Sequence, residues 1–306
     1  MNLLISAFAA VLAGLCLATA GVLQQRSASR RPSDERMSWK LLRRLAADRT
    51  WLLGIGAAAL SYGFQAVALT FGPLTLVQPL VVSELLFAVP VSVRLRDLRL
   101  RRREWAAVAS VVTGLAIGIV AADPQRGHPV QPASTWAPAL GGVMLLVVGS
   151  LVAAKKVSGP IKASAFALAG ACTMGLQSAL YAATLVYLRK ELWGVFLHWE
   201  TWLLIVASLG GMFLIQNAFQ SGPLAASTPL IDSVLPLVAI ALGVGLFGET
   251  IRTSWWGLAG ATLGLLLLVA GIVTLDTSPV VRKEQRIEQQ EQERTAARES
   301  GRDADG

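Results

Sequence analysis

The strongest constraint on this chain is a series of long apolar segments that contain almost no charged side chain. Each is close to the ~20 residues that an α-helix needs to cross a bilayer. Strands are excluded, because open sheet edges stay unpaired in lipid and the segments lack an alternation of period two. We therefore predict an all-α, polytopic membrane helix bundle with about nine transmembrane helices. The nine predicted spans cover residues 3–23, 52–70, 74–93, 106–122, 136–153, 163–187, 202–219, 224–247 and 255–275.

The positive charge of the chain lies between these spans. Charged residues make up 15% of the sequence, against about 25% in soluble domains. Lysine and arginine concentrate in the loops after spans 1, 3 and 5, and the positive-inside rule places such loops in the cytoplasm. We therefore expect a multi-pass protein of the plasma membrane, with its N-terminus outside and its C-terminus in the cytoplasm. No nucleic-acid-reading element accompanies the net charge of +8, so we expect no nucleic-acid partner.

The sequence also contains an internal repeat. A Gly-Pro-Leu motif followed by Pro-Leu starts at Gly72 and again, 150 residues later, at Gly222. The same offset pairs Gly114 with Gly264. Spans 1–4 thus match spans 6–9, and span 5 has no counterpart. Because the shift is five spans, matched helices cross the membrane in opposite directions, which is an inverted repeat.

This repeat divides the chain into four predicted parts. Residues 1–122 form the first transmembrane repeat, 123–160 a linker with the unpaired span 5, and 161–275 the second repeat. Residues 276–306 are rich in charges of both signs, cannot bury a core and are expected to form a charged cytoplasmic tail. Inverted repeats are typical of secondary transporters, which bind solute between the two halves near the midplane of the membrane.

The repeated Gly-Pro-Leu and Pro-Leu, together with Phe247-Gly248-Glu249, resemble the drug/metabolite transporter (DMT) superfamily, whose EamA-like members carry Gly-Glu before their last helix. Residues 21–26 and 77–80 are similar to the nine-span, NIPA-like magnesium-transporter branch. The resemblance covers residues 3–275 and implies a secondary transporter of a small solute or metabolite that works by alternating access. The NIPA-like branch implies a magnesium ion transporter as the alternative. The first repeat departs from the EamA pattern, because Leu98-Arg99 stands where Gly-Glu would be.

Two acidic residues lie deep within apolar spans, where ionisable groups are costly and indicate function. Glu84 and Asp232 occupy nearly equivalent positions in the two repeats, ~14–15 Å from the ends of their spans. In a cavity between inverted halves, such carboxylates would bind and release protons or hold a cation. The alternative is a structural role in hydrogen bonds between helices.

Further polar residues accompany these acids. Thr228 lies one helical turn before Asp232, and Pro79 and Pro229 are predicted helix breaks that free a backbone carbonyl. Spans 2, 6 and 7 carry polar stripes that either face a cavity or bond neighbouring helices. The predicted substrate-binding residues are Asp232, Thr228, Glu84, Gln65, Gln177, Tyr181, Gln216 and Asn217.

The sequence carries no signature of an enzyme. It lacks a P-loop, a Gly-x-Ser-x-Gly elbow, a His-Glu-x-x-His helix and any Cys/His metal spacing, so we expect neither catalysis nor a cofactor. A non-transporting membrane scaffold subunit remains the competing class. GxxxG motifs at Gly114 and Gly260 predict close helix packing, within one chain or in a homodimer, and membrane lipid is a further partner. Glu249, near a span end, is expected to be solvated or bonded to backbone, with a gate as the alternative.

Overall fold

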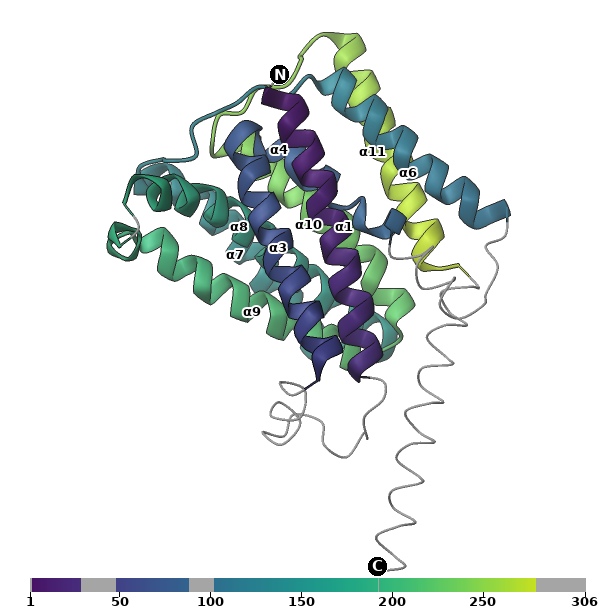
Figure 1. The fold of residues 1–306 in the computed structure, drawn as a ribbon. Helices are drawn as coiled ribbons and strands as arrows, with labels where there is room; N and C mark the ends of the chain where they lie inside the picture. The colour runs from purple at the N-terminus through teal and green to yellow at the C-terminus, as the bar shows by residue number, and fades with distance from the viewer. Residues whose placement is uncertain (1, 29–47, 88–101, 192, 279–306) are drawn as a thin grey trace, which may run out of the picture.

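The computed structural model describes residues 2–28, 48–87, 102–191 and 193–278, and in these ranges the protein is a bundle of helices without a strand (Figure 1). Figure 1 shows α6 and α11 side by side on one flank of the bundle, with α7, α8 and α9 on the opposite flank. The helices are α1 (Asn2–Ala28), α3 (Arg49–Phe71), α4 (Leu74–Val81), α6 (Arg102–Ala122), α7 (Ala133–Lys156), α8 (Gly159–Lys190), the 3₁₀ turn η2 (Gly194–Leu197), α9 (Trp199–Ser221), α10 (Leu224–Gly245) and α11 (Trp255–Asp276).

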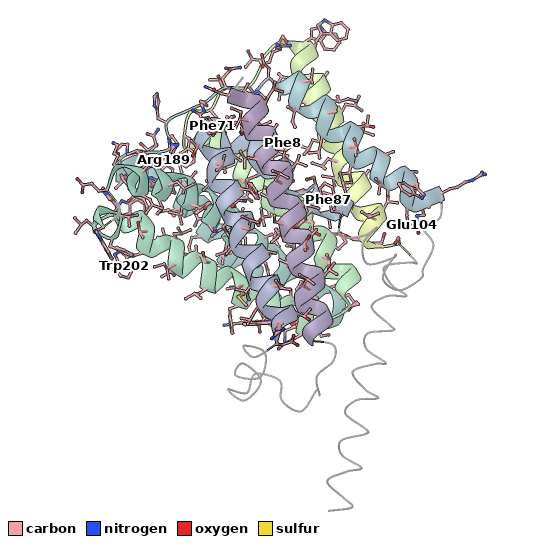
Figure 2. All side chains as sticks on the ribbon, viewed as in Figure 1. Phe8, Phe71, Phe87, Glu104, Arg189 and Trp202 are labelled. Carbon is pink, nitrogen blue, oxygen red and sulfur yellow. The ribbon has the colours of Figure 1, made fainter. Side chains whose placement is uncertain are left out.

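Eight of the described helices are long and apolar enough to cross a membrane, which confirms a polytopic membrane protein. Large apolar side chains cover the outside of the bundle. Phe8 on α1 is 68% exposed and Trp202 on α9 is 57% exposed, and both are labelled in Figure 2. A surface with so many exposed apolar side chains suits lipid, because its exposure to water would be energetically unfavourable.

The third predicted span, residues 74–93, is described as far as Phe87 and is interrupted. Helix α4 ends at Val81, and the chain becomes helical again only at Glu84. Ser83 donates its backbone N–H to the carbonyl of Leu80, three residues back, at 3.0 Å. Pro79 has no N–H to donate, which weakens the helix at this point. The predicted break therefore occurs, a few residues after the proline.

The break predicted at Pro229 was wrong. Helix α10 runs without interruption from Leu224 to Gly245 and contains both Pro229 and Pro236. Each proline removes one backbone hydrogen bond, and a transmembrane helix tolerates this loss when neighbouring helices hold it. In this bundle α8, α4 and α11 all pack against α10.

The packing follows the pairing of the two repeats. Helix α1 packs against α3 and α4, and its counterpart α8 packs against α9 and α10. Two further contacts join counterparts directly, α4 with α10 and α6 with α11. Elements that contact their own counterparts lie next to the axis that relates inverted repeats. The unpaired α7 packs against α8.

The α6–α11 contact depends on glycines. A Cβ atom on Gly264 would lie 2.4 Å from the backbone nitrogen of Gly118 and 2.7 Å from the carbonyl oxygen of Gly114. Such distances are shorter than atoms can approach, so only glycine allows the two backbones to meet. The GxxxG motifs therefore pack against each other within one chain, and Gly114 and Gly264 are also the residues that the sequence offset pairs.

Replacing Gly264 by alanine should lower the stability of the protein. The added methyl group meets the backbone of α6 and must push the helices apart, an overpacking that destabilises by about 1–3 kcal/mol. The measurement is the thermal unfolding midpoint of the purified protein in detergent. Gly210→Ala on α9 is the matched control, because nothing lies within 4 Å of the added Cβ atom. Equal midpoints for the two variants would contradict this account.

Candidate functional site

A cavity of about 120 Å³ lies between the two repeats. Roughly 10–15 Å³ of such space admits one water molecule, so several waters or a small solute would fit. Its walls come from α1, α3, the broken α4 segment, α8 and α10. We call it the acidic cavity, and the residues that line it are Leu17, Ser61, Tyr62, Gln65, Gln78, Val81, Val82, Glu84, Met174, Gln177, Ser178, Asp232, Leu235 and Pro236.

Both predicted acids reach the acidic cavity. Glu84 is the first residue of the helical segment that follows the break in α4, and Asp232 lies on α10. Gln65 on α3 and Gln177 on α8 also line the cavity, as the sequence predicted. Residues from both repeats thus converge on one space, and two of the four are ionisable.

Tyr181 contacts a residue of the cavity wall without lining the cavity itself. Its hydroxyl donates to the carbonyl oxygen of Tyr62 at 2.9 Å, and the two rings meet edge to face with their centroids 5.9 Å apart. Tyr62 lines the cavity, whereas Tyr181 does not. Tyr181 therefore holds the α8 side of the wall against α3, where the sequence predicted direct contact with solute.

Three predicted site residues besides Tyr181 lie outside the cavity. Gln216 is exposed on α9, and Asn217 donates to the carbonyl oxygen of Phe213 on its own helix at 2.8 Å. Helix α9 packs mainly on α8, so its polar stripe does not reach the space between the repeats. Thr228 lies one turn from Asp232 but beyond the cavity wall.

Gln78 lines the cavity and escaped the sequence prediction. Its side chain is 2% exposed, and its Nε2 has no hydrogen-bond partner in the part of the chain that the structure describes. The signal was present in the repeat, because Gln78 stands 150 residues before Thr228. Ser83 and Ser233, separated by the same offset, are also buried with unpartnered Oγ atoms within the described ranges. Unsatisfied buried polar groups of this kind are uncommon in proteins and suit a polar ligand or water.

The sequence prediction also placed Asp276 in the wrong part of the chain. The sequence assigned it to the charged tail, but it is the last residue of α11 and only 6% exposed. Its carboxyl group lies near enough to that of Asp232 on α10 for the two to interact electrostatically. Glu84 is close enough for its charge to interact with both. Asp276 therefore belongs to the helix bundle and not to the charged tail.

Among the residues that the structure describes, the lining of the acidic cavity contains two acids and no lysine, arginine or histidine. Among the described residues, no group of three or more His, Cys, Asp or Glu side chains is arranged to hold a metal ion. The electrostatics of the cavity therefore favour a positively charged or neutral polar occupant over an anion.

Glu249 joins the two repeats at a place away from the cavity. Glu249, in the turn between α10 and α11, accepts the backbone N–H of Leu74 at 2.6 Å and that of Thr75 at 2.9 Å. These groups belong to the first turn of α4, which has no intrahelical acceptor for them and favours a negative charge. Burial raises the pKa of the Glu249 carboxyl, and the hydrogen bonds from Thr75 and Leu74 and the charge of Arg126 oppose this rise. The expected backbone-bonded carboxylate is confirmed.

The loop that follows α6 completes this closure. Gln125 donates to the carbonyl of Thr250 at 2.8 Å, and His128 donates to that of Phe247 at 2.8 Å. A Cβ atom on Gly127 would clash with the same Phe247 oxygen, so only glycine lets this loop approach the turn after α10 so closely. The end of the bundle at which α4 begins is therefore closed by backbone contacts between the linker and the second repeat, beside the hydrogen bonds that Glu249 accepts from α4.

Comparison with known proteins gives a relative but no activity. No family model matches the chain, and no solved structure matches it. An uncharacterized protein of Corynebacterium glutamicum is 31% identical over 277 residues, which cover 90% of this chain and 95% of that protein. The similarity thus extends over nearly all of both chains.

Replacing Glu249 by alanine should destabilise the protein. Two buried backbone donors of α4 would lose their acceptor, at about 1–3 kcal/mol for each unsatisfied group. Thermal unfolding in detergent measures the effect. Asp123→Asn is the control, because Asp123 pairs with Arg252 in an exposed ion pair worth at most about 1 kcal/mol. If Glu249→Ala unfolded at the temperature of the control, Glu249 would not hold α4 in place.

Proposed function

We propose that this chain, which belongs to the same family as the Corynebacterium glutamicum protein, is a secondary transporter that moves a small solute by alternating access between its two inverted repeats. The observation that carries the proposal is the acidic cavity, which Glu84 approaches from one repeat and Asp232 from the other. Membership of the drug/metabolite transporter superfamily, on the EamA-like pattern, is part of the proposal.

The arrangement of polar groups supports transport over a scaffold role. A scaffold would bond its buried acids to neighbouring helices and leave no space between its halves. Here the two acids face a common cavity beside the unpartnered Nε2 of Gln78, in the described part of the chain. The helix break after Val81 lies at the same place, and irregular backbone within a membrane is tolerated where it lines a cavity. Broken helices at a midplane site are common in secondary transporters.

Alternating access also requires a closure that can open. The first turn of α4 is attached to the second repeat through the carboxylate of Glu249. We infer that this end of the bundle opens when α4 separates from the turn between α10 and α11. The extensive α1–α3 and α8–α9 contacts lie within single repeats and would be kept during this movement.

The proposed solute is a small organic cation or protonated amine. The two acids, which have no basic partner among the described residues of the cavity lining, would leave an anion unfavourably placed. Magnesium, which the NIPA-like resemblance implied, is the alternative solute, since carboxylates and water also suit Mg²⁺. We also propose the plasma membrane as the location, with the C-terminus in the cytoplasm, on the basis of the loop charges.

The test is solute flux in proteoliposomes with four labelled probes: tetraethylammonium, a neutral amino acid, a nucleobase and Mg²⁺. We expect protein-dependent uptake of tetraethylammonium and a loss of at least about tenfold in Asp232→Asn, since removal of ~1.4 kcal/mol of interaction changes affinity tenfold. Asp123→Asn, a change in an exposed acid, should transport as the wild type does.

Two results would sink the proposal. One is uptake by Asp232→Asn at the wild-type rate for every transported probe. The other is the absence of protein-dependent flux for all four. Transport of Mg²⁺ alone would favour the magnesium alternative and overturn the choice of an organic cation.

A further inference from the structure

A second cavity, of about 230 Å³, lies between the α6–α11 pair and the helices α4 and α10. It exists because α6 and α11 pack far more extensively on each other than on the rest of the bundle (Figure 1). The described residues that line it carry no charge, and Thr75 and Thr262 are the only polar side chains among them. We call it the apolar cavity.

A space of this size and character calls for an apolar occupant. Protein interiors contain few voids larger than a water molecule. Water needs several polar partners, which a lining such as Leu115, Ile119, Ile240 and Leu268 does not offer. The apolar cavity is partly open to the outside of the bundle, and that outside is covered by lipid in a membrane. The hydrocarbon at hand is therefore an acyl chain.

The length of the apolar cavity matches one leaflet of the bilayer. On α11 its lining runs from Leu258 to Leu268, a rise of about 15 Å at ~1.5 Å per residue. The hydrocarbon core of a bilayer is about 30 Å thick, so one leaflet supplies about half of it. A single acyl chain that enters from one membrane surface would lie along the whole cavity.

One end of the apolar cavity carries an exposed ion pair. Ala122 and Pro124, on either side of Asp123, line the cavity, and so does Ile251, which precedes Arg252. Arg252 donates from its guanidinium to Asp123 at 2.9 Å, and its side chain is 52% exposed. A guanidinium has several N–H donors, so this contact leaves donors for a phosphate. Because the pair is neutral overall, it suits a zwitterionic headgroup better than an anionic one.

Two tryptophans place this end of the cavity at the level of the lipid headgroups. Trp255 and Trp256 begin α11 and are 65% and 72% exposed. Exposed tryptophan side chains favour the interface between hydrocarbon and water. Arg252, only a few residues before them, therefore lies where lipid phosphates lie.

We propose that the apolar cavity binds one acyl chain of a zwitterionic membrane phospholipid, whose phosphate accepts hydrogen bonds from Arg252. The site does not rest on the proposed transport function, because no described residue lines both cavities. Helix α4 separates the two. Thr75 and Pro79 line the apolar cavity, and Gln78 lines the acidic one. The acyl chain thus fills the space on the far side of α4 from the acidic cavity.

Native mass spectrometry of the delipidated protein in mild detergent tests the site. The probes are dioleoylphosphatidylethanolamine and dioleoylglycerol, which has the same chains and no phosphate. The wild type should bind one molecule of the phospholipid at least about tenfold more tightly than dioleoylglycerol, the ratio that ~1.4 kcal/mol produces. Arg252→Gln should bind the two probes equally. A preference for the phospholipid that survives in Arg252→Gln overturns the role of this residue.

A second pair of variants tests the position of the acyl chain. Ala261→Phe places a large side chain inside the apolar cavity and should abolish binding of both probes. Ala259→Phe, on the same helix, is the matched control, because Ala259 is exposed and does not line the cavity. Ala122→Phe fills the cavity from α6 and should act as Ala261→Phe does. Elution as a single species and a melting temperature near that of the wild type show that each variant is folded.

Three results would overturn the site. One is binding of the phospholipid by folded Ala261→Phe and Ala122→Phe at the affinity of the wild type. Another is an equal loss in Ala259→Phe, which would mean that the lipid covers the outside of the bundle at large. The third is a wild type that binds neither probe and elutes as a dimer, since a second copy of the chain would then cover this face.

Discussion

Within a bilayer the chain itself must supply a partner for every backbone hydrogen-bonding group, and the structure of this protein follows from that requirement. It makes the spans helical and leaves apolar side chains such as Phe8 and Trp202 on the outside. Polar groups must then gather in the interior. Helix association in lipid depends on close packing, and the contact of Gly264 with the backbone of Gly114 and Gly118 provides it for α6 and α11.

The same requirement explains why the span that is broken in the described part of the chain lies at the acidic cavity. An interruption facing lipid would leave backbone groups unpaired, whereas one facing a polar space can be satisfied by water or solute. The break after Val81 brings Glu84 to the start of a new helical segment, where the cavity wall is polar. Its counterpart α10 stays continuous through Pro229, so the two repeats differ in structure at the point where their sequences agree best.

The repeats also differ at their ends. In the second repeat, Glu249 accepts hydrogen bonds from the first turn of α4 and so closes one end of the bundle. The residue 150 positions earlier is Arg99, which lies outside the described residues and has the opposite charge. A carboxylate can accept from the N–H groups of a helix start, and a guanidinium cannot. Near-symmetric repeats therefore carry different chemistry at positions that alternating access would use differently.

The sequence by itself determined the helical membrane class, the positions of the spans and the pairing of the repeats, because span length and a fixed offset are properties of the chain alone. It also predicted that Glu84, Asp232, Gln65 and Gln177 face the interior of the bundle, since a polar residue at midspan depth is costly against lipid. Only the tertiary structure decided that Gln216 and Asn217 face away from the cavity, that Gln78 lines it, and that Asp276 is buried at the end of α11. Periodicity gives the depth and the face of a residue on its helix, but which neighbouring helix covers that face is settled by packing.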